Sequence, residues 1–288
     1  MKILVTGKDG FLGKNLKEFI TWADDNEWVY IGRGDYDLVD SKAVAKLYRD
    51  HNPDTIVHLA GMASARNNDS SFIDANIKGT YNLLTLAPKQ VDFVFASSVL
   101  VYGDNNSCTH EFDKLNPNSP YAVSKVTCEQ LITLFYKQGK IRPRILRFCG
   151  IVGPHLKHGR IYSIVKGERN INMFGKQPGN YCPIITTKTA CKAITKAVRS
   201  NKAKILCNVT PSQDTISIEQ VFDILQSELG ITLNVNWNND NSPSEYICCH
   251  NSMLRYELDV DITESSRDAL KHGLKLYLKN EHQTLTTV

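Results

Sequence analysis

The stretch TGKDGFLG, from Thr6 to Gly13, decides the fold because it places Gly7, Gly10 and Gly13 directly after the apolar run KILV. A glycine-rich turn between a first strand and the next helix exposes backbone N–H groups at the positive end of that helix. A pyrophosphate can approach such a backbone closely, because it lacks Cβ atoms. The spacing is G-x-x-G-x-x-G, and a tightly packed turn without a ligand is the alternative interpretation. Its position between a strand and a helix favours nucleotide binding.

Short β-branched apolar runs alternate with longer amphipathic stretches from KILVT at the amino terminus to RPRILRF at residues 142–148. This alternation is typical of βαβ units and predicts an α/β fold with a Rossmann-like, doubly wound parallel sheet. After about Gly150 the pattern changes to loops rich in Gly, Pro and His. We therefore predict a dinucleotide-binding domain at residues 1–149 and a smaller, mixed substrate-binding lobe at 150–288, with 190–210 returning to the sheet.

The charge of the chain is nearly balanced, because 34 Lys and Arg face 30 Asp and Glu and the net charge is +4 without a basic run. Nucleic acid is therefore not an expected partner. No apolar segment approaches the roughly 20 residues that a membrane-spanning helix needs. The start MKILVTGKDG is unlike a signal peptide. We expect a cytoplasmic protein without a membrane partner.

The eight cysteines contain no C-x-x-C pair, and most lie in apolar runs, where a thiol behaves as a small buried side chain. Neither a zinc site nor a disulfide framework is expected. His155 and His158 are three residues apart in a loop, but no further ligand cluster accompanies them. No metal site is predicted.

The motif PYAVSK places Tyr121 and Lys125 four residues apart, on one face of a predicted helix. An ammonium beside a phenol lowers the pKa of the phenol from about 10, so Tyr121 is a candidate general acid and base. A half-exposed tyrosine with a solvated lysine is the alternative. Upstream, a predicted buried strand ends in Ser97 and Ser98, at the edge where open α/β sheets bind ligands.

Together these motifs resemble the extended short-chain dehydrogenase/reductase family, in particular its nucleotide-sugar epimerases, dehydratases and reductases. The resemblance covers almost the whole chain and implies a Rossmann fold with NAD or NADP as cofactor. The motifs that carry it, in the family's order, are TGKDGFLG, HLAG at 58–61, NIKGT at 76–80, SSVLVYG, YAVSK, RFCGIVGPH at 147–155, NSMLRYEL and ALKHGLKLYL.

By position, the resemblance implies that Tyr121 moves the proton of a sugar hydroxyl or carbonyl while hydride passes between the sugar carbon and nicotinamide C4. Lys125 would bind the nicotinamide ribose and keep Tyr121 acidic. Ser98, with Ser97 as the competing candidate, would bond the same substrate oxygen, and Asn76 would support Lys125. The implied cofactor-binding residues are Gly7, Lys8, Asp9, Gly10, Phe11, Leu12, Gly13, Arg33, Asp37, Leu38, Leu59, Ala60, Gly61, Asn76, Tyr121 and Lys125.

The sequence departs from the family at two places. Dehydratases of the family carry an Asp-Glu pair directly after the serine, but here Val99 and Leu100 stand there and neither can move a proton. This favours a nucleotide-sugar epimerase or a keto-sugar reductase. Residues 179–189 lack the Arg and Asp that the family often places there. Candidates for phosphate contacts are therefore Lys157, His158 or Arg160, and a solvated basic loop is the alternative.

Two other classes remain open. A reductase of a non-sugar carbonyl compound would need an aromatic-lined apolar pocket, and a catalytically silent dinucleotide-binding sensor would not need the Ser-Tyr-Lys set. The basic segments KHGR and KGERN favour a nucleotide sugar with its diphosphate. The resemblance also suggests a homodimer through the helices that include residues 76–87 and 119–138.

The choice between NAD and NADP rests on the end of the second predicted strand, IGR at 31–33. NAD-preferring Rossmann domains carry an acidic residue there, and this chain has none. Arg33 can hold a 2′-phosphate as a charge-assisted fork, and Lys8 can add a second positive charge. Asp35 and Asp37 complicate this, and the resemblance places Asp37 beside the adenine. We predict NADP in preference to NAD.

Overall fold

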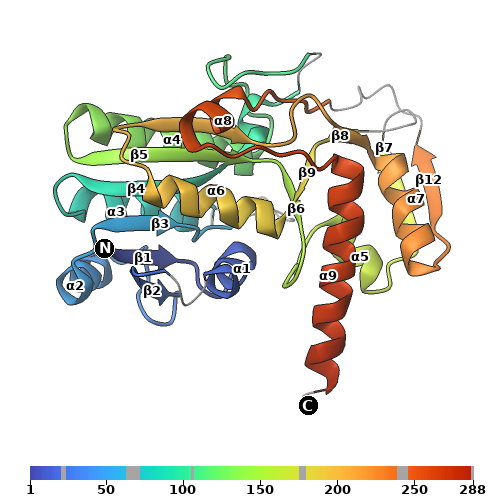
Figure 1. Cartoon of the computed structure of the whole chain (residues 1–288), viewed down its shortest axis with the longest axis horizontal. Helices are drawn as coiled ribbons and strands as arrows, with labels where there is room; N and C mark the ends of the chain where they lie inside the picture. The colour runs from blue at the N-terminus through green and yellow to red at the C-terminus, as the bar shows by residue number, and fades with distance from the viewer. Residues whose placement is uncertain (21–23, 63–71, 105–106, 175–179, 239–245, 287–288) are drawn as a thin grey trace.

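The computed structural model describes residues 1–288 except 21–23, 63–71, 105–106, 175–179, 239–245 and 287–288. Its largest element within these residues is a six-stranded sheet with strand order β10-β5-β4-β3-β1-β2, in which every neighbouring pair is parallel (Figure 1). This confirms the predicted Rossmann-like fold. The strands are β1 (Lys2–Thr6), β2 (Glu27–Ile31), β3 (Thr55–His58), β4 (Val91–Ser98), β5 (Ile141–Phe148) and β10 (Ile205–Val209).

Helices cover both faces of the sheet. The side chains of β1 alternate between two apolar cores, because Ile3 and Val5 belong to one and Leu4 belongs to the other. A sheet buried on both faces is the expected consequence of parallel βαβ units. The first core is covered by α1 (Phe11–Phe19) and α6 (Thr187–Arg199), and the second by α2 (Ser41–His51), α3 (Gly79–Leu86) and α4 (Pro120–Lys137).

The helix starts follow from local sequence. Asp40 caps α2, and Ser119 caps α4 by accepting a hydrogen bond from the Ala122 N–H, with Pro120 in the first turn. The capping box predicted at Ser217 and Gln220 is confirmed at the start of α7 (Ile218–Leu229). Such caps satisfy backbone N–H groups that the helix itself leaves without partners.

A second lobe lies beside the sheet (Figure 1) and has its own apolar core, which includes Ile164, Phe222 and Leu270. Helices α5 (Arg160–Val165) and α9 (Ser266–Thr286) enclose this core together with α7. The paired strands here are β6 (Gly150–Val152) with β9 (Ile184–Thr186), β8 (Tyr181–Cys182) with β11 (Ile216–Ser217), and β7 (Asn170–Phe174) with β12 (Asn234–Asn238).

The chain does not stay in this lobe after Gly150, because α6 and β10 return to the large sheet, where β10 extends the edge beside β5. Helix α8 (Ser252–Leu258) then packs against β10. The polar connector NNDNSPSE, residues 238–245, lies almost entirely outside the described residues.

No disulfide framework was predicted, but one pair of cysteines is joined. Cys108 and Cys248, which are 140 residues apart, are joined by a disulfide with their Cα atoms 4.4 Å apart. The two segments run side by side, since the Thr109 N–H donates to the Cys248 carbonyl and the rings of His110 and His250 stack at 3.7 Å. Spacing along the chain could not indicate this pair, because only the fold brings the segments together.

Candidate active site

Two adjoining cavities open at the carboxyl ends of the strands. The chain changes direction across the sheet at β1, which lies between β2 and β3, and open α/β sheets bind ligands at such a switch point. The first cavity has a volume of about 490 Å³ and the second about 430 Å³. Both are lined by Gly7, Gly10, Leu59, Gly61 and Met62. The glycine loop therefore lies between the two cavities, where a ligand long enough to occupy both would have its middle part.

The three glycines of the loop serve different purposes. Gly7 has a φ of +83°, and a Cβ there would lie 2.7 Å from the Ala60 nitrogen. A Cβ on Gly13 would lie 2.2 Å from the Gly7 carbonyl oxygen. A Cβ on Gly10 would meet only that oxygen, at 3.2 Å, and Gly10 lines both cavities. Packing thus explains Gly7 and Gly13, whereas Gly10 leaves space that fits a pyrophosphate at the N-terminus of α1.

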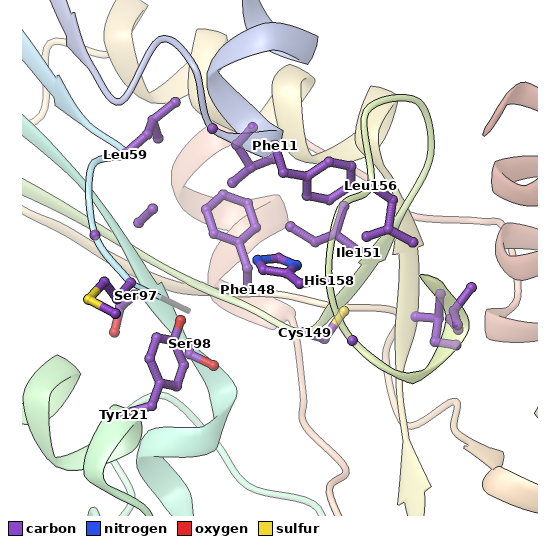
Figure 2. Close-up of a pocket in the computed structure, with 18 of the residues that line it drawn as sticks. Phe11, Leu59, Ser97, Ser98, Tyr121, Phe148, Cys149, Ile151, Leu156 and His158 are labelled. Carbon is purple, nitrogen blue, oxygen red and sulfur yellow. The ribbon is translucent and has the colours of Figure 1, made fainter. Parts of the chain in front are cut away.

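Tyr121 and Ser98 meet at one end of the first cavity (Figure 2). Tyr121 lies in the first turn of α4, and Ser98 is the last residue of β4. The Ser98 side chain lies close enough to the Tyr121 phenol to lower its pKa, against the larger effect of burial. Two residues that the sequence singled out separately, 23 positions apart by their numbers, therefore form one polar group in an otherwise largely apolar wall.

Lys125 lies one turn after Tyr121 on α4 and is 7% exposed. Its Nζ donates a hydrogen bond of 2.8 Å to the Ala96 carbonyl and lies 5.7 Å from the centroid of the Tyr121 ring. Burial lowers the pKa of Lys125 to about 8. The predicted Tyr-Lys pair therefore shares one face of a helix, and both residues line the first cavity.

The sequence predicted that Lys125 lowers the pKa of Tyr121, but the structure shows the opposite direction. Burial raises the pKa of Tyr121 to about 12, and the nearby Ser98 side chain offsets this only in part. The Lys125 ammonium is turned toward the Ala96 carbonyl, so it does not stabilise the phenolate. Tyr121 is therefore protonated near neutral pH in the chain without ligand.

The two candidate serines are neighbours at the end of β4, and their side chains have different partners. The Ser97 hydroxyl donates a 2.5 Å hydrogen bond to the Glu129 carboxylate, which also forms a buried ion pair with Arg147 at 2.6 Å. Ser98 instead contacts Tyr121. Because successive side chains of a strand point to opposite faces, Ser97 and Ser98 serve different partners, and Ser98 is the one beside the phenol.

Asn76 connects the loop after β3 to helix α4. It lies in a π-helical turn, Ile73–Lys78, and such turns are frequent at functional sites. Its amide donates to the Ser124 hydroxyl at 2.9 Å, and its Oδ1 accepts from the Met62 N–H at 2.7 Å. A Cβ on Gly61 would lie 2.9 Å from that same oxygen. Asn76 holds the surroundings of Lys125, although no hydrogen bond to Lys125 itself is found among the described contacts.

The other predicted cofactor residues are divided between the cavities. Phe11 and Leu12 line the first cavity. The second cavity is lined by Ala60 after β3 and by Asp9, Arg33, Asp37 and Leu38 near the end of β2. Lys8 is not among the residues that line either of these two cavities.

The two cations predicted to hold a 2′-phosphate are paired with carboxylates. The Lys8 ammonium lies 2.5 Å from Asp35, and the Arg33 Nε lies 3.5 Å from Asp37. The Arg33 side chain is 86% exposed. Hydrogen bonding to Asp35 raises the pKa of Lys8, so this ammonium stays charged.

Two of the three predicted phosphate-contacting residues reach the first cavity. His158 and Arg160 line it, and Figure 2 shows His158 beside Phe148. Lys157 is exposed and is not part of this wall. The predicted loop segment 179–189 begins outside the described residues, and its described part contributes Cys182 and Ile184.

Sequence reasoning missed residues that hold the site in place. Glu129 follows Lys125 by four positions on α4, and this spacing was the available signal. His58, at the end of β3, bonds the Thr6 hydroxyl at 2.8 Å and the Thr80 hydroxyl at 2.9 Å. Burial lowers the pKa of His58 to about 3, so the ring is neutral. Nothing local in the sequence predicts these contacts, since each joins separate elements.

Within the described ranges no helix combines the length and apolar character needed to cross a membrane. The same residues hold no cluster of three or more His, Cys, Asp or Glu side chains suited to a metal ion. Of the two histidines considered as ligands, His155 bonds Glu18 at 2.6 Å and His158 faces the first cavity.

Comparison with known proteins identifies the class. The sequence model of the NAD dependent epimerase/dehydratase family matches residues 3–225. The chain is 28% identical over 192 residues to the dTDP-D-glucose 4,6-dehydratase of Dictyostelium discoideum, covering 53% of this chain and 44% of that protein. It is 28% identical over 324 aligned positions to a putative UDP-glucose 4-epimerase of Methanocaldococcus jannaschii, and the match covers 98% of this chain and 100% of that protein.

Among solved structures, the UDP-glucuronic acid 4-epimerase of Bacillus cereus, in complex with UDP-glucuronic acid and NAD, is similar with a TM-score of 0.78 and 22% identity. The likeness covers 99% of this chain and 100% of that one. The chain therefore belongs to the NAD dependent epimerase/dehydratase family. It spans less than half the length of the dehydratase that it matches.

Proposed function

We propose that the chain is an NAD(P)-dependent enzyme that acts on a nucleotide sugar, as an epimerase or a keto-sugar reductase. The observation that carries this proposal is that Tyr121 and Ser98 lie together at one end of a cavity that continues past Gly10. The same cavity holds Lys125 in its wall. A protein that only binds a dinucleotide has no need of a phenol and a hydroxyl aimed at one point.

Each residue has a separate task in this proposal. A bound nicotinamide cofactor supplies a hydride acceptor or donor at the sugar carbon. Tyr121 takes the proton from the sugar hydroxyl or returns it to the carbonyl, as a general base or acid. Ser98 fixes the same oxygen, and Lys125 contributes positive charge and bonds the ribose once it leaves the Ala96 carbonyl. Val99 and Leu100 carry no acid or base, which argues against elimination of water.

The two parts of the chain share this work. We infer that residues 1–149 hold the dinucleotide and 150–288 supply most of the substrate wall, with α6 and β10 completing the sheet. His158 and Arg160 belong to this wall and suit the diphosphate of a nucleotide sugar. The family relation supports NAD or NADP as the cofactor, and the sequence-based preference for NADP through Arg33 stays a prediction at this point.

A second candidate is a reductase of a non-sugar carbonyl compound. The first cavity has a mainly apolar wall in the region of Cys149, with side chains that would also suit an apolar substrate. Figure 2 shows Phe148, Ile151 and Leu156 together there. The apolar lining residues on this side are Phe148, Cys149, Ile151, Leu156, Cys182, Ile184, Ile218 and Val221.

A homodimer through α3 and α4 is also proposed. Large apolar side chains are exposed on these two neighbouring helices: Tyr81 and Leu86 on α3, and Val123 and Leu134 on α4. Sedimentation of the wild type and of Tyr81→Glu tests this, and a monomeric wild type would contradict it.

A cytoplasmic location stays a prediction, and the Cys108–Cys248 disulfide argues against it because disulfides are rare in the cytoplasm.

The proposed function is tested by thermal shift with a panel of UDP-, dTDP- and GDP-sugars, in the presence of NAD or NADP. A ligand at 100 times its Kd stabilises the fold by about 2.7 kcal/mol, which such a scan detects. We expect a shift with a cofactor and a further shift with one class of nucleotide sugar. A shift with cofactor and with none of the sugars would contradict the substrate class and favour the non-sugar carbonyl compound.

A further inference from the structure

The end of β2 lacks the acidic side chain that normally binds the adenosine ribose, since Gly32 follows the strand. The nearest acid in the following turn is already engaged. The Asp35 carboxylate accepts a 2.7 Å hydrogen bond from the Gly32 N–H and pairs with the Lys8 ammonium at 2.5 Å. Asp35 is therefore turned back onto the strand end and holds the turn together.

The space above Gly32 is filled by a different carboxylate. A Cβ placed on Gly32 would lie 2.3 Å from Oδ2 of Asp9, and the next nearest atoms belong to the flexible side chain of Lys8 at 3.2 Å and beyond. The Asp9 carboxylate thus lies where a side chain of the strand end would begin. Asp9 comes from the glycine loop and lines the second cavity together with Arg33 and Asp37.

Backbone hydrogen bonds fix the glycine loop, which carries Asp9, to the end of β2. The N–H groups of Gly7 and Lys8 both donate to the Ile31 carbonyl, at 2.9 and 3.0 Å. Ile31 is the last residue of β2, and Gly32 follows it directly. The glycine loop and the strand end are therefore joined directly, and this keeps Asp9 beside Gly32 in the lining of the second cavity.

The charges around this point favour hydroxyl groups over a phosphate. Asp9 and Asp37 line the second cavity near the end of β2, and the Arg33 guanidinium there is paired with Asp37. A 2′-phosphate adds a charge of about −1.5 to −2 and only acceptor oxygens. The ribose hydroxyls of NAD instead offer donors, which a carboxylate accepts as charge-assisted hydrogen bonds.

We propose that Asp9 of the glycine loop replaces the missing strand-end acid, binds the adenosine ribose hydroxyls and makes the chain select NAD over NADP. This rests on the proposed dinucleotide binding and reverses the preference that Arg33 suggested from sequence alone. The glycine at position 32 is part of the same arrangement, because a larger residue would displace the Asp9 carboxylate.

Calorimetric titration of the full chain with NAD⁺ and with NADP⁺ tests this without requiring turnover. We expect the wild type to bind NAD⁺ at least about tenfold more tightly, and Asp9→Asn to lose most of that preference, a change of about 1.4 kcal/mol. Asp74→Asn is the matched control, since it removes the same charge from the same cavity, and it should leave the ratio of the two Kd values nearly unchanged. Asp9 and Asp74 are exposed, so both variants should fold.

A relocation variant makes the test sharper. Asp9→Ala combined with Gly32→Asp moves the carboxylate from the loop to the strand end, and it should regain the NAD⁺ preference that Asp9→Ala alone loses. Unchanged Kd values in Asp9→Asn, with NAD⁺ still bound, would overturn the role of Asp9 and leave the proposed function standing. A wild type that prefers NADP⁺ and loses the preference in Arg33→Ala would also overturn it. A wild type that binds neither cofactor would overturn the proposed function as well.

Discussion

The catalytic end of the first cavity keeps Ser98 and Lys125 buried, whereas the second cavity leaves its charged groups largely exposed. Lys125 is 7% exposed in the first cavity, and the side chain of Arg33 is 86% exposed in the second. Burial changes the pKa of Lys125 and Tyr121, so small rearrangements there alter chemistry. Exposed ion pairs are screened by water and contribute little energy. We therefore expect cofactor selectivity in the second cavity to depend on where the glycine loop places the Asp9 carboxylate.

The strongest test of this contrast removes the phenol of the first cavity. Tyr121→Phe should lower kcat by about 10²–10⁴-fold, the usual contribution of a positioned acid or base. Cofactor Kd should stay nearly constant because only a hydroxyl is lost, whereas Lys125→Ala should damage both. Steady-state kinetics and calorimetry measure this. Normal turnover by Tyr121→Phe on any identified substrate would remove Tyr121 from the mechanism.

The buried support of the first cavity should be nearly as sensitive. Glu129→Ala leaves Arg147 buried without its partner and should destabilise the fold by about 3–5 kcal/mol. It should also release Ser97, whose hydroxyl bonds this carboxylate. Urea unfolding measures the loss. Glu27→Ala breaks the exposed pair with Lys2 and should cost about 1 kcal/mol or less, so equal losses in the two variants would contradict the contrast.

The lowered pKa of Lys125 predicts a dependence of stability on pH in the chain without cofactor. Lys125 has a folded-state pKa of about 8 against 10.5 in the unfolded chain, so the unfolded chain binds more protons between these values. Keeping Lys125 buried and charged then costs about 3 kcal/mol below pH 8, and this cost fades as the pH rises to 10.5.

The variant that reports this cost is Lys125→Met, measured by urea unfolding at several pH values. The free energy of unfolding of Lys125→Met minus that of the wild type should shrink by about 3 kcal/mol from pH 7 to 10.5. Lys8→Met, at the exposed pair with Asp35, should show no shrinkage of this sign, because the pKa of Lys8 is raised. A constant difference for Lys125→Met would mean that its ammonium is hydrated in the folded chain.

The smallest expected effect concerns the loop between the cavities. Gly10→Val should weaken dinucleotide binding by about tenfold while the chain still folds, because a Cβ there meets only the Gly7 oxygen at 3.2 Å. Gly13→Val should instead lower stability, since its Cβ would lie 2.2 Å from that oxygen. If Gly10→Val binds cofactor as tightly as the wild type by calorimetry, all three glycines serve packing alone.

Local sequence carries the information for elements whose signals lie within a few residues. The alternation of apolar runs predicted the parallel sheet, and Ser217 with Gln220 predicted the start of α7. The motif PYAVSK predicted that Tyr121 and Lys125 share a helix face. These statements hold because a period of 2 or 3.6 residues fixes which side chains share a face.

What the sequence by itself determined was the class of fold, the family and the residue types available for chemistry. Only the tertiary structure decided how these residues are arranged. It places Ser98 rather than Ser97 beside Tyr121, directs the Lys125 ammonium to the Ala96 carbonyl, and joins Cys108 to Cys248 in a disulfide. The reason is physical, because burial and distance between segments arise only when separate strands and loops pack together. The carboxylate of Asp9 beside Gly32 is the clearest example, since these two residues are 23 positions apart along the chain and lie next to each other in space.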